Sequence, residues 1–191
     1  MSIDSARIIC TGCDYEASEV YRPIRIRYLY SNGQTVETGR IKGWCYNCAS
    51  YSDIEKINQG DLYEELNSRE RKKFEICQRQ QGLNRGILSN FRHRTKKRQL
   101  QERLKWLDKE IAELRNLLEI AMGRKSNARC LKCWSDKTVP LRFDSESNIA
   151  SNFKHKCGGN LQIVHDQSGP RFNFRVKTYI LNEEGEFLGE E

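Results

Sequence analysis

The pattern of apolar positions between residues 89 and 123 predicts the longest helix of the chain. Seven apolar residues recur there at spacings that alternate between four and three: Leu100, Leu104, Leu107, Ile111, Leu114, Leu118 and Ala121. Only a helix places such residues on one stripe, and the seven-residue repeat is typical of a coiled coil. We therefore expect a coiled coil over about 89–123.

Charged residues beside this stripe favour pairing with a second copy. Arg103 with Asp108, and Glu110 with Arg115, are opposite in sign at the spacing that meets across a parallel two-stranded coil. We therefore expect a homodimer. The alternative is intrachain: residues 53–81 also have a helical pattern, begun by Asp53 as a cap, and this helix could fold back over the same stripe.

Both ends of the chain have the period-two alternation that predicts strands. Residues 24–30 alternate, and Ser31-Asn32-Gly33 supplies a turn with the positive φ of a tight hairpin. Alternation returns at 139–143, 161–163 and 172–180. The predicted fold class is therefore α+β: two small β-modules, residues 1–52 and 127–191, joined by a long helical region, residues 53–126.

Composition and charge favour small parts and an anionic partner. Among 191 residues, 37% are apolar and 31% are charged, which is little apolar material for one large core. The net charge is +7, and residues 61–126 supply all of this excess, with 17 basic and 10 acidic side chains. No run of 18 apolar residues and no leader is present, so we expect a soluble cytoplasmic protein without a membrane partner.

Cysteine pairs at the two ends predict metal sites. Cys10 with Cys13, and Cys45 with Cys48, are two Cys-x-x-Cys pairs that bracket the predicted hairpin. Four thiolates at one tetrahedral point suit Zn²⁺. The segment resembles the zinc-ribbon family, in which such pairs flank a small antiparallel sheet. The alternatives are packed, metal-free cysteines or a thiol redox pair.

The C-terminal region repeats this theme with one histidine. Cys130 and Cys133 form the third pair, and Cys157 is followed by two glycines. This region also resembles a zinc ribbon, which implies a fourth ligand. His155 is the predicted one, with His165 in reserve, because imidazole reaches farther than a thiol. We therefore expect two zinc ions per chain.

These motifs point to binding and not to catalysis. A site saturated by four protein ligands leaves no position for substrate, and no phosphate loop or nucleophile elbow is present, so we expect a protein that is not an enzyme. Five bases lie together at the start of the long helix: Arg92, Arg94, Lys96, Lys97 and Arg98. Phosphates are their obvious counter-charge, and the stretch resembles a basic leucine zipper, which binds DNA through such helices.

The sequence therefore predicts a zinc-binding protein that associates with nucleic acid, as a dimer within a larger assembly. DNA and RNA are not distinguished. The alternative is an adaptor whose ribbons bind partner proteins while the basic face meets an acidic protein surface.

Overall fold

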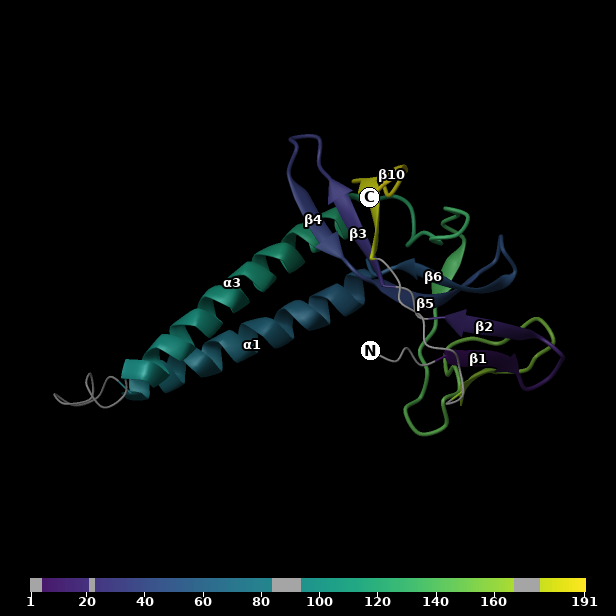
Figure 1. Cartoon of the computed structure of the whole chain (residues 1–191), viewed down its shortest axis with the longest axis horizontal. Helices are drawn as coiled ribbons and strands as arrows, with labels where there is room; N and C mark the ends of the chain where they lie inside the picture. The colour runs from purple at the N-terminus through teal and green to yellow at the C-terminus, as the bar shows by residue number, and fades with distance from the viewer. Residues whose placement is uncertain (1–4, 21–22, 84–93, 167–175) are drawn as a thin grey trace. The chain divides into compact units, whose positions relative to one another are not determined.

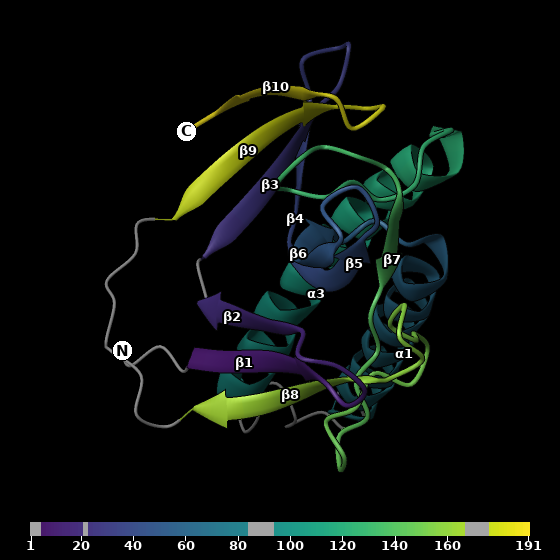
Figure 2. The same ribbon diagram turned by 90° about the vertical axis from the view of Figure 1, so that its right-hand side faces the viewer.

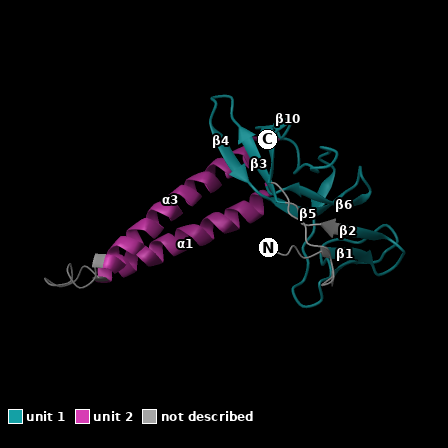
Figure 3. Ribbon diagram, viewed as in Figure 1, with its two compact units in different colours: residues 1–56, 125–191 teal, residues 57–124 magenta. Residues whose placement is uncertain are grey.

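The computed structural model describes residues 5–20, 23–83, 94–166 and 176–191. The chain divides into two units, which Figure 3 colours separately. Unit 1 comprises residues 1–56 and 125–191, and unit 2 comprises residues 57–124. The two ends of the chain thus build one unit together, in place of the two separate end modules that the sequence predicted.

The first sheet of unit 1 joins the N-terminus to a strand from the C-terminal third. It has the order β2-β1-β8, from β1 (Ser5–Cys10), β2 (Glu16–Val20) and β8 (Leu161–Asp166). Both pairings are antiparallel, and Ile8 lies opposite Ile163. Figure 2 shows the three strands side by side. β1 is therefore the central strand. β8 pairs with the edge of β1 that the local β1–β2 hairpin leaves open.

The second sheet contains the predicted hairpin. Its order is β10-β9-β3-β4, from β3 (Ile24–Leu29), β4 (Thr35–Thr38), β9 (Lys177–Asn182) and β10 (Phe187–Glu190). Gly33 has a φ of 81° in the turn between β3 and β4, which confirms the need for a residue free to adopt positive φ there. β3 pairs with β9 in parallel, a long-range contact that alternation alone does not specify.

The third sheet, β6-β5-β7, is built from β5 (Arg40–Cys45), β6 (Ser50–Glu55) and β7 (Thr138–Pro140). Asp53 lies within β6, so the prediction that it caps a helix was wrong. Its carboxylate forms ion pairs with Arg40 and with Lys42 on the neighbouring strand. The Cys45–Cys48 turn connects β5 to β6. β6 continues to Glu55, past residue 53, where the sequence predicted the start of a helix.

The core of unit 1 lies between the first and third sheets. Its buried members are Ile8 and Cys10 of β1, Leu161 of β8, Trp44 of β5, and Leu141, Ala150 and Phe153 from the segment between β7 and β8. A second buried group is polar. Glu55 is fully buried, accepts a hydrogen bond from the Tyr28 hydroxyl at 3.1 Å, and accepts another from the Arg129 amide at 2.6 Å. These bonds satisfy a carboxylate that would be costly to bury alone.

Unit 2 is a hairpin of two long helices, α1 (Gln59–Leu83) and α3 (Arg94–Gly123). Figure 1 shows them running side by side in opposite directions. Asn58 caps α1, because its Oδ1 accepts a hydrogen bond from the Asp61 amide at 3.1 Å. At the open end of the hairpin, Gln59 donates to the Ala121 carbonyl at 2.7 Å.

The leucine stripe of α3 packs inside the chain against α1. Leu107, Ile111, Leu114 and Ala121 are buried as the heptad predicts, whereas Leu100, Leu104 and Leu118 are half-buried. Two residues outside the predicted stripe, Leu117 and Ile120, are also buried. The apolar face is thus wider than a coiled-coil seam, as is typical of a helix that packs within one chain. The structure therefore shows the intrachain alternative.

Three of the four charges predicted to pair across a dimer, those of Asp108, Glu110 and Arg115, form ion pairs within the hairpin. Three ion pairs join the two helices: Arg69 with Glu110 at 3.1 Å, Lys73 with Asp108 at 2.6 Å, and Arg115 with Glu70 at 2.7 Å. All three join residues 69–73 of α1 to residues 108–115 of α3. Among the described residues, no helix is both long enough and apolar enough to cross a membrane.

Candidate metal centres

Two clusters of four side chains in unit 1 have the composition of metal sites. Site 1 is formed by Cys10, Cys13, His155 and Cys157, and the ligand atoms all lie within 4.8 Å of one another. Site 2 meets the same limit and is formed by Cys45, Cys48, Cys130 and Cys133. All eight residues predicted as metal ligands therefore lie in a cluster of four.

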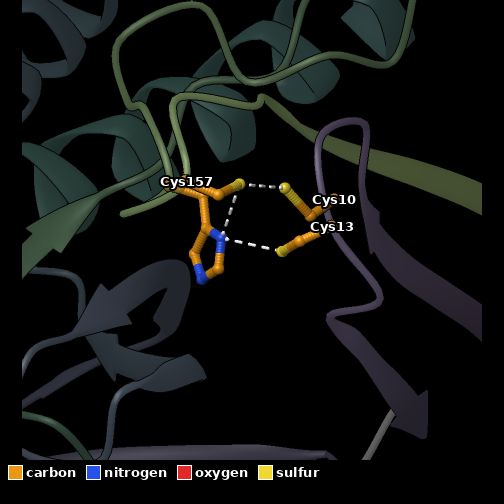
Figure 4. A group of neighbouring side chains, drawn as sticks. Cys10, Cys13 and Cys157 are labelled. Atoms are coloured by element: carbon orange, nitrogen blue, oxygen red, sulfur yellow. Dashed lines mark hydrogen bonds between the residues drawn. The ribbon is translucent and has the colours of Figure 1, made fainter.

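Site 1 is assembled from the β1–β2 turn and the loop that precedes β8. The Sγ atoms of Cys10 and Cys157 are 3.4 Å apart. Nδ1 of His155 lies 3.3 Å from Sγ of Cys13 and 3.3 Å from Sγ of Cys157. Figure 4 shows the three cysteines pointing toward a common point. His155 is 4% exposed and Cys10 is 8% exposed, whereas Cys13 and Cys157 are exposed.

Two glycines allow the loops of site 1 to meet. A Cβ on Gly159 would lie 2.5 Å from the Gly12 nitrogen and 2.7 Å from Sγ of Cys10. A side chain therefore does not fit between the loops. Two hydrogen bonds fasten the loops together: the Thr11 amide donates to the Asn160 carbonyl, and the Asn160 amide donates to Oγ1 of Thr11, both at 2.9 Å.

Site 2 is assembled from the β5–β6 turn and the segment that follows the helical hairpin in sequence. Sγ of Cys45 lies 3.6 Å from Sγ of Cys133, and Sγ of Cys48 lies 4.0 Å from Sγ of Cys130. Cys45 and Cys130 are fully buried, and the other two are half-buried. Backbone hydrogen bonds tie the segment to the sheet, from Leu131 to the Asp53 carbonyl for example.

Backbone amides point at sulfur in each of the four loops. In site 1, the Gly12 amide donates to Sγ of Cys10 and the Gly159 amide to Sγ of Cys157, each at 3.4 Å. In site 2, the Cys48 amide donates to Cys45 and the Lys132 amide to Cys130, also at 3.4 Å. Such donors stabilise thiolates, the form in which cysteine binds a metal.

The thiols differ in how readily they ionise in the absence of metal. Burial raises the pKa of Cys45 and that of Cys48. Burial also opposes ionisation of Cys133, but hydrogen bonds from the Ser135 backbone and the Asn47 side chain outweigh it and lower that pKa to about 6. Hydrogen bonds from the Gly159 amide and from His155 lower the pKa of Cys157 to about 6.

Both clusters fit a tetrahedral zinc ion. With Zn–S bonds of ~2.3 Å, a tetrahedron separates its sulfurs by about 3.8 Å. The observed sulfur–sulfur distances of 3.4, 3.6 and 4.0 Å bracket that value. The donor chemistry, four thiolates in one site and three thiolates with an imidazole in the other, is that of structural zinc sites. Each cluster offers four protein ligands, which fills a tetrahedral shell.

The structure pairs the ligands differently from the sequence prediction. The sequence placed the first two cysteine pairs in one site and the last three cysteines with His155 in the other. In the structure each site takes one half from each end of the chain. The reason is strand pairing: β8 joins β1, and β7 joins β5, so each N-terminal turn meets a C-terminal loop. His165 lies in β8 opposite Ala6, and its side chain is outside the described part of the structure.

Aromatic side chains connect the two sites. Trp44 directly precedes Cys45, and its ring lies 5.3 Å from the ring of His155, in an edge-on arrangement. Tyr15 contacts both rings, at 5.3 Å from Trp44 and 5.1 Å from His155. The ring of Phe153 lies 5.2 Å from that of Trp44. A ligand of site 1 thus packs on the residue beside a ligand of site 2. No motif in the sequence marks Tyr15 or Phe153 for this role.

Of the predicted nucleic-acid-binding residues, the structure describes only some side chains. Arg92 lies outside the described residues, and Arg94 begins α3 without a described side chain. Lys96 and Arg98 are exposed in the first turns of α3, and Lys97 is half-buried. Arg98 forms an ion pair with Glu102 at 3.0 Å.

Comparisons of the chain with protein-family models, with curated proteins and with solved structures find no match.

Proposed function

We propose that this is a non-catalytic protein in which two structural zinc ions hold unit 1 together, while the helical hairpin of unit 2 binds nucleic acid. The observation that carries the first part is the pair of four-ligand clusters. Each cluster joins segments more than 80 residues apart in sequence, such as Cys45 and Cys133. The sheets of unit 1 are small, so metal binding would supply much of their folding energy.

Saturated ligand shells support a structural role over a catalytic one. A catalytic zinc keeps a position open for water or substrate. Here the fourth position of site 1 is taken by Nδ1 of His155, which is buried between Trp44 and Tyr15. No open position remains in either tetrahedron.

Charge distribution along the hairpin supports nucleic-acid binding by one of its ends. Residues 72–83 and 94–108, which lie next to the inter-helix connection, carry nine basic and three acidic side chains. Residues 59–71 and 109–123, at the opposite end, carry four basic and seven acidic ones. The hairpin thus has a net charge of +6 at one end and −3 at the other. The positively charged end is suited to bind phosphates.

The basic side chains at this end of the hairpin remain available to a partner. Several are exposed and form no ion pair among the described residues: Lys72, Arg79, Lys96, Arg103 and Lys105. We call these five lysine and arginine side chains the tip bases. They belong to both helices, so a phosphate backbone could contact the two together. Such contacts would read shape and charge more than sequence.

The metal assignment can be tested by native mass spectrometry of the full chain. The wild-type protein should carry two zinc ions. A double variant within site 1, Cys13→Ser with Cys157→Ser, should keep one. A double variant across the sites, Cys13→Ser with Cys48→Ser, should keep none. The pairing predicted from sequence gives the reverse result for the two variants, and a metal-free wild-type chain would overturn the zinc assignment altogether.

The nucleic-acid proposal can be tested by salt titration with labelled duplex DNA, single-stranded DNA and RNA. Replacing the five tip bases by glutamine should weaken binding. It should also make the slope of log K against the logarithm of salt concentration shallower, by about 0.7–0.9 for each phosphate that is no longer neutralised. The control is Arg71→Gln with Lys109→Gln, which removes two exposed positive charges of the opposite end and should weaken binding less for each charge removed. Absence of binding at low salt, or equally weakened binding in both variants, would refute the proposal.

One surface supports an adaptor as the second candidate. The ring of Phe187 stacks on Trp134 at 4.5 Å, and Tyr179 lies 5.2 Å from Trp134. Phe187 is 42% exposed, and Leu188 beside it is 53% exposed. Acidic residues surround this patch in sequence, at 183, 184, 186, 190 and 191, so it does not suit phosphates. Retention of a protein partner by a chain that lacks nucleic-acid affinity would favour this function.

A further inference from the structure

The two sites differ in how far their cysteines are exposed to solvent. In site 1, Cys13 and Cys157 are exposed, whereas site 2 has no exposed cysteine. Cys45 and Cys130 are 0% exposed. Reaction of a metal-bound thiolate with an oxidant in solution requires an approach to the sulfur, so access decides which site reacts first. Site 1 is the accessible one.

Site 1 also holds two sulfurs close enough to form a disulfide. Sγ of Cys157 is 3.4 Å from Sγ of Cys10, and an S–S bond of about 2.05 Å requires them to approach by about 1.4 Å. The two cysteines lie on different loops, and both loops are fastened by the hydrogen bonds between Thr11 and Asn160. The loops therefore stay together while the sulfurs react.

We propose that site 1 is an oxidation site for peroxides, at which a disulfide between Cys157 and Cys10 forms and zinc is released, while site 2 keeps its metal. This inference rests on the zinc binding proposed above. Sγ of Cys157 attacks one peroxide oxygen and the O–O bond breaks. Cys157 becomes a sulfenic acid, and the departing hydroxide takes a proton to give water.

Sγ of Cys10 then attacks the sulfenic sulfur. The S–S bond forms, the S–O bond breaks, and a second water leaves after protonation. In total, two thiolates lose two electrons, and one hydrogen peroxide with two protons becomes two waters. Two of the four ligands of site 1 are consumed, and Cys13 with His155 are too few to retain a structural zinc ion. A thiol reductant reverses the change.

Partial burial protects site 2 from the same reaction. Cys48 and Cys133 are half-buried, and the other two ligands of site 2 are 0% exposed. The closest sulfur pair is 3.6 Å apart, between Cys45 and Cys133, and its first member is fully enclosed. The expected outcome is release of one zinc ion per chain.

Zinc release can be followed with a chromogenic chelator while hydrogen peroxide is added to the full chain. The chain should carry Cys77→Ser, because Cys77 is a half-buried thiol of α1 outside both sites. One equivalent should leave at least about tenfold faster than the second. Peptide mapping by mass spectrometry at that stage should find the Cys10–Cys157 disulfide, and a thiol reductant with added zinc should restore two ions.

Replacing a ligand by another ligand should give a variant that still folds. Cys157→His keeps four ligands but removes the attacking sulfur, so the protein should bind two zinc ions and lack the fast phase. Cys133→His makes the matched change in site 2 and should leave the fast phase unaltered. Equal release from both sites, or a fast phase that persists in Cys157→His, overturns the inference while zinc binding itself stands. If the chain carries no zinc after purification under reducing conditions, both the inference and the proposed zinc binding are overturned.

Discussion

Replacing Gly159 by alanine tests the close approach between the two loops of site 1. The new Cβ would lie 2.5 Å from the Gly12 nitrogen, 2.7 Å from Sγ of Cys10 and 2.9 Å from the Gly12 Cα. Two of these three atoms belong to backbone, which cannot rotate away as a flexible side chain can. The loops must therefore separate for the variant to fold.

Separation of the loops should weaken metal binding at site 1 alone. Forcing a methyl group into a packed position costs about 1–3 kcal/mol. That cost corresponds to a zinc affinity lowered roughly 5- to 150-fold. Separation also strains the hydrogen bonds between Thr11 and Asn160, which lie beside the new methyl group in the same pair of loops.

Competition with a chelator of known zinc affinity measures this change for each site. Gly39→Ala is the control, because no atom lies within 4 Å of a Cβ at that position and its φ is not positive. We expect Gly39→Ala to match the wild type at both sites, and Gly159→Ala to differ only in its weaker site. A Gly159→Ala protein that binds two zinc ions with wild-type affinity would refute the packing argument.

Two further predictions concern the hairpin and the dependence on pH. Leu107 is 2% exposed, so Leu107→Ala should lower the free energy of unfolding by about 2–5 kcal/mol, measured as loss of helical circular dichroism in urea. Met122→Ala is the control at a 69% exposed position of α3 and should change it by less than about 0.5 kcal/mol. At pH 7 the raised pKa values of Cys45 and Cys48 keep both thiols protonated, so zinc must displace these protons. Zinc affinity should therefore rise with pH and fall as the pH drops, because each of these two thiols releases its proton when it binds zinc at site 2. Chelator titrations between about pH 6 and 8 measure this slope, and a pH-independent affinity would contradict it.

The helical region shows where sequence periodicity is informative and where it stops. The heptad in residues 100–121 predicted the helix and most of its buried face, including Leu107, Ile111 and Leu114. It left the partner open, because an intrachain helix and a second copy bury the same leucines equally well. The structure shows an intrachain partner, with Asp108 and Arg115 forming ion pairs with Lys73 and Glu70 of α1.

Metal ligands could be named from sequence because their signal is local. A Cys-x-x-Cys spacing marks one turn that presents two sulfurs, and this spacing identified Cys10, Cys13, Cys45, Cys48, Cys130 and Cys133. His155 and Cys157 were found from their chemistry and from the glycines that follow them. The grouping into sites was not local, since Cys10 and Cys157 are 147 residues apart and meet only through the pairing of β1 with β8.

The sequence by itself determined the kinds of local structure in this protein: turns that present sulfur, strands with alternating faces, and a long helix with one apolar side. Each follows from residues a few positions apart. The tertiary structure alone decided which of these pieces meet. Four similar half-sites can combine in several ways that satisfy zinc equally, and the choice among them is made by the backbone pairing of β8 with β1 and of β7 with β5, and by the core around Trp44 that these pairings bury.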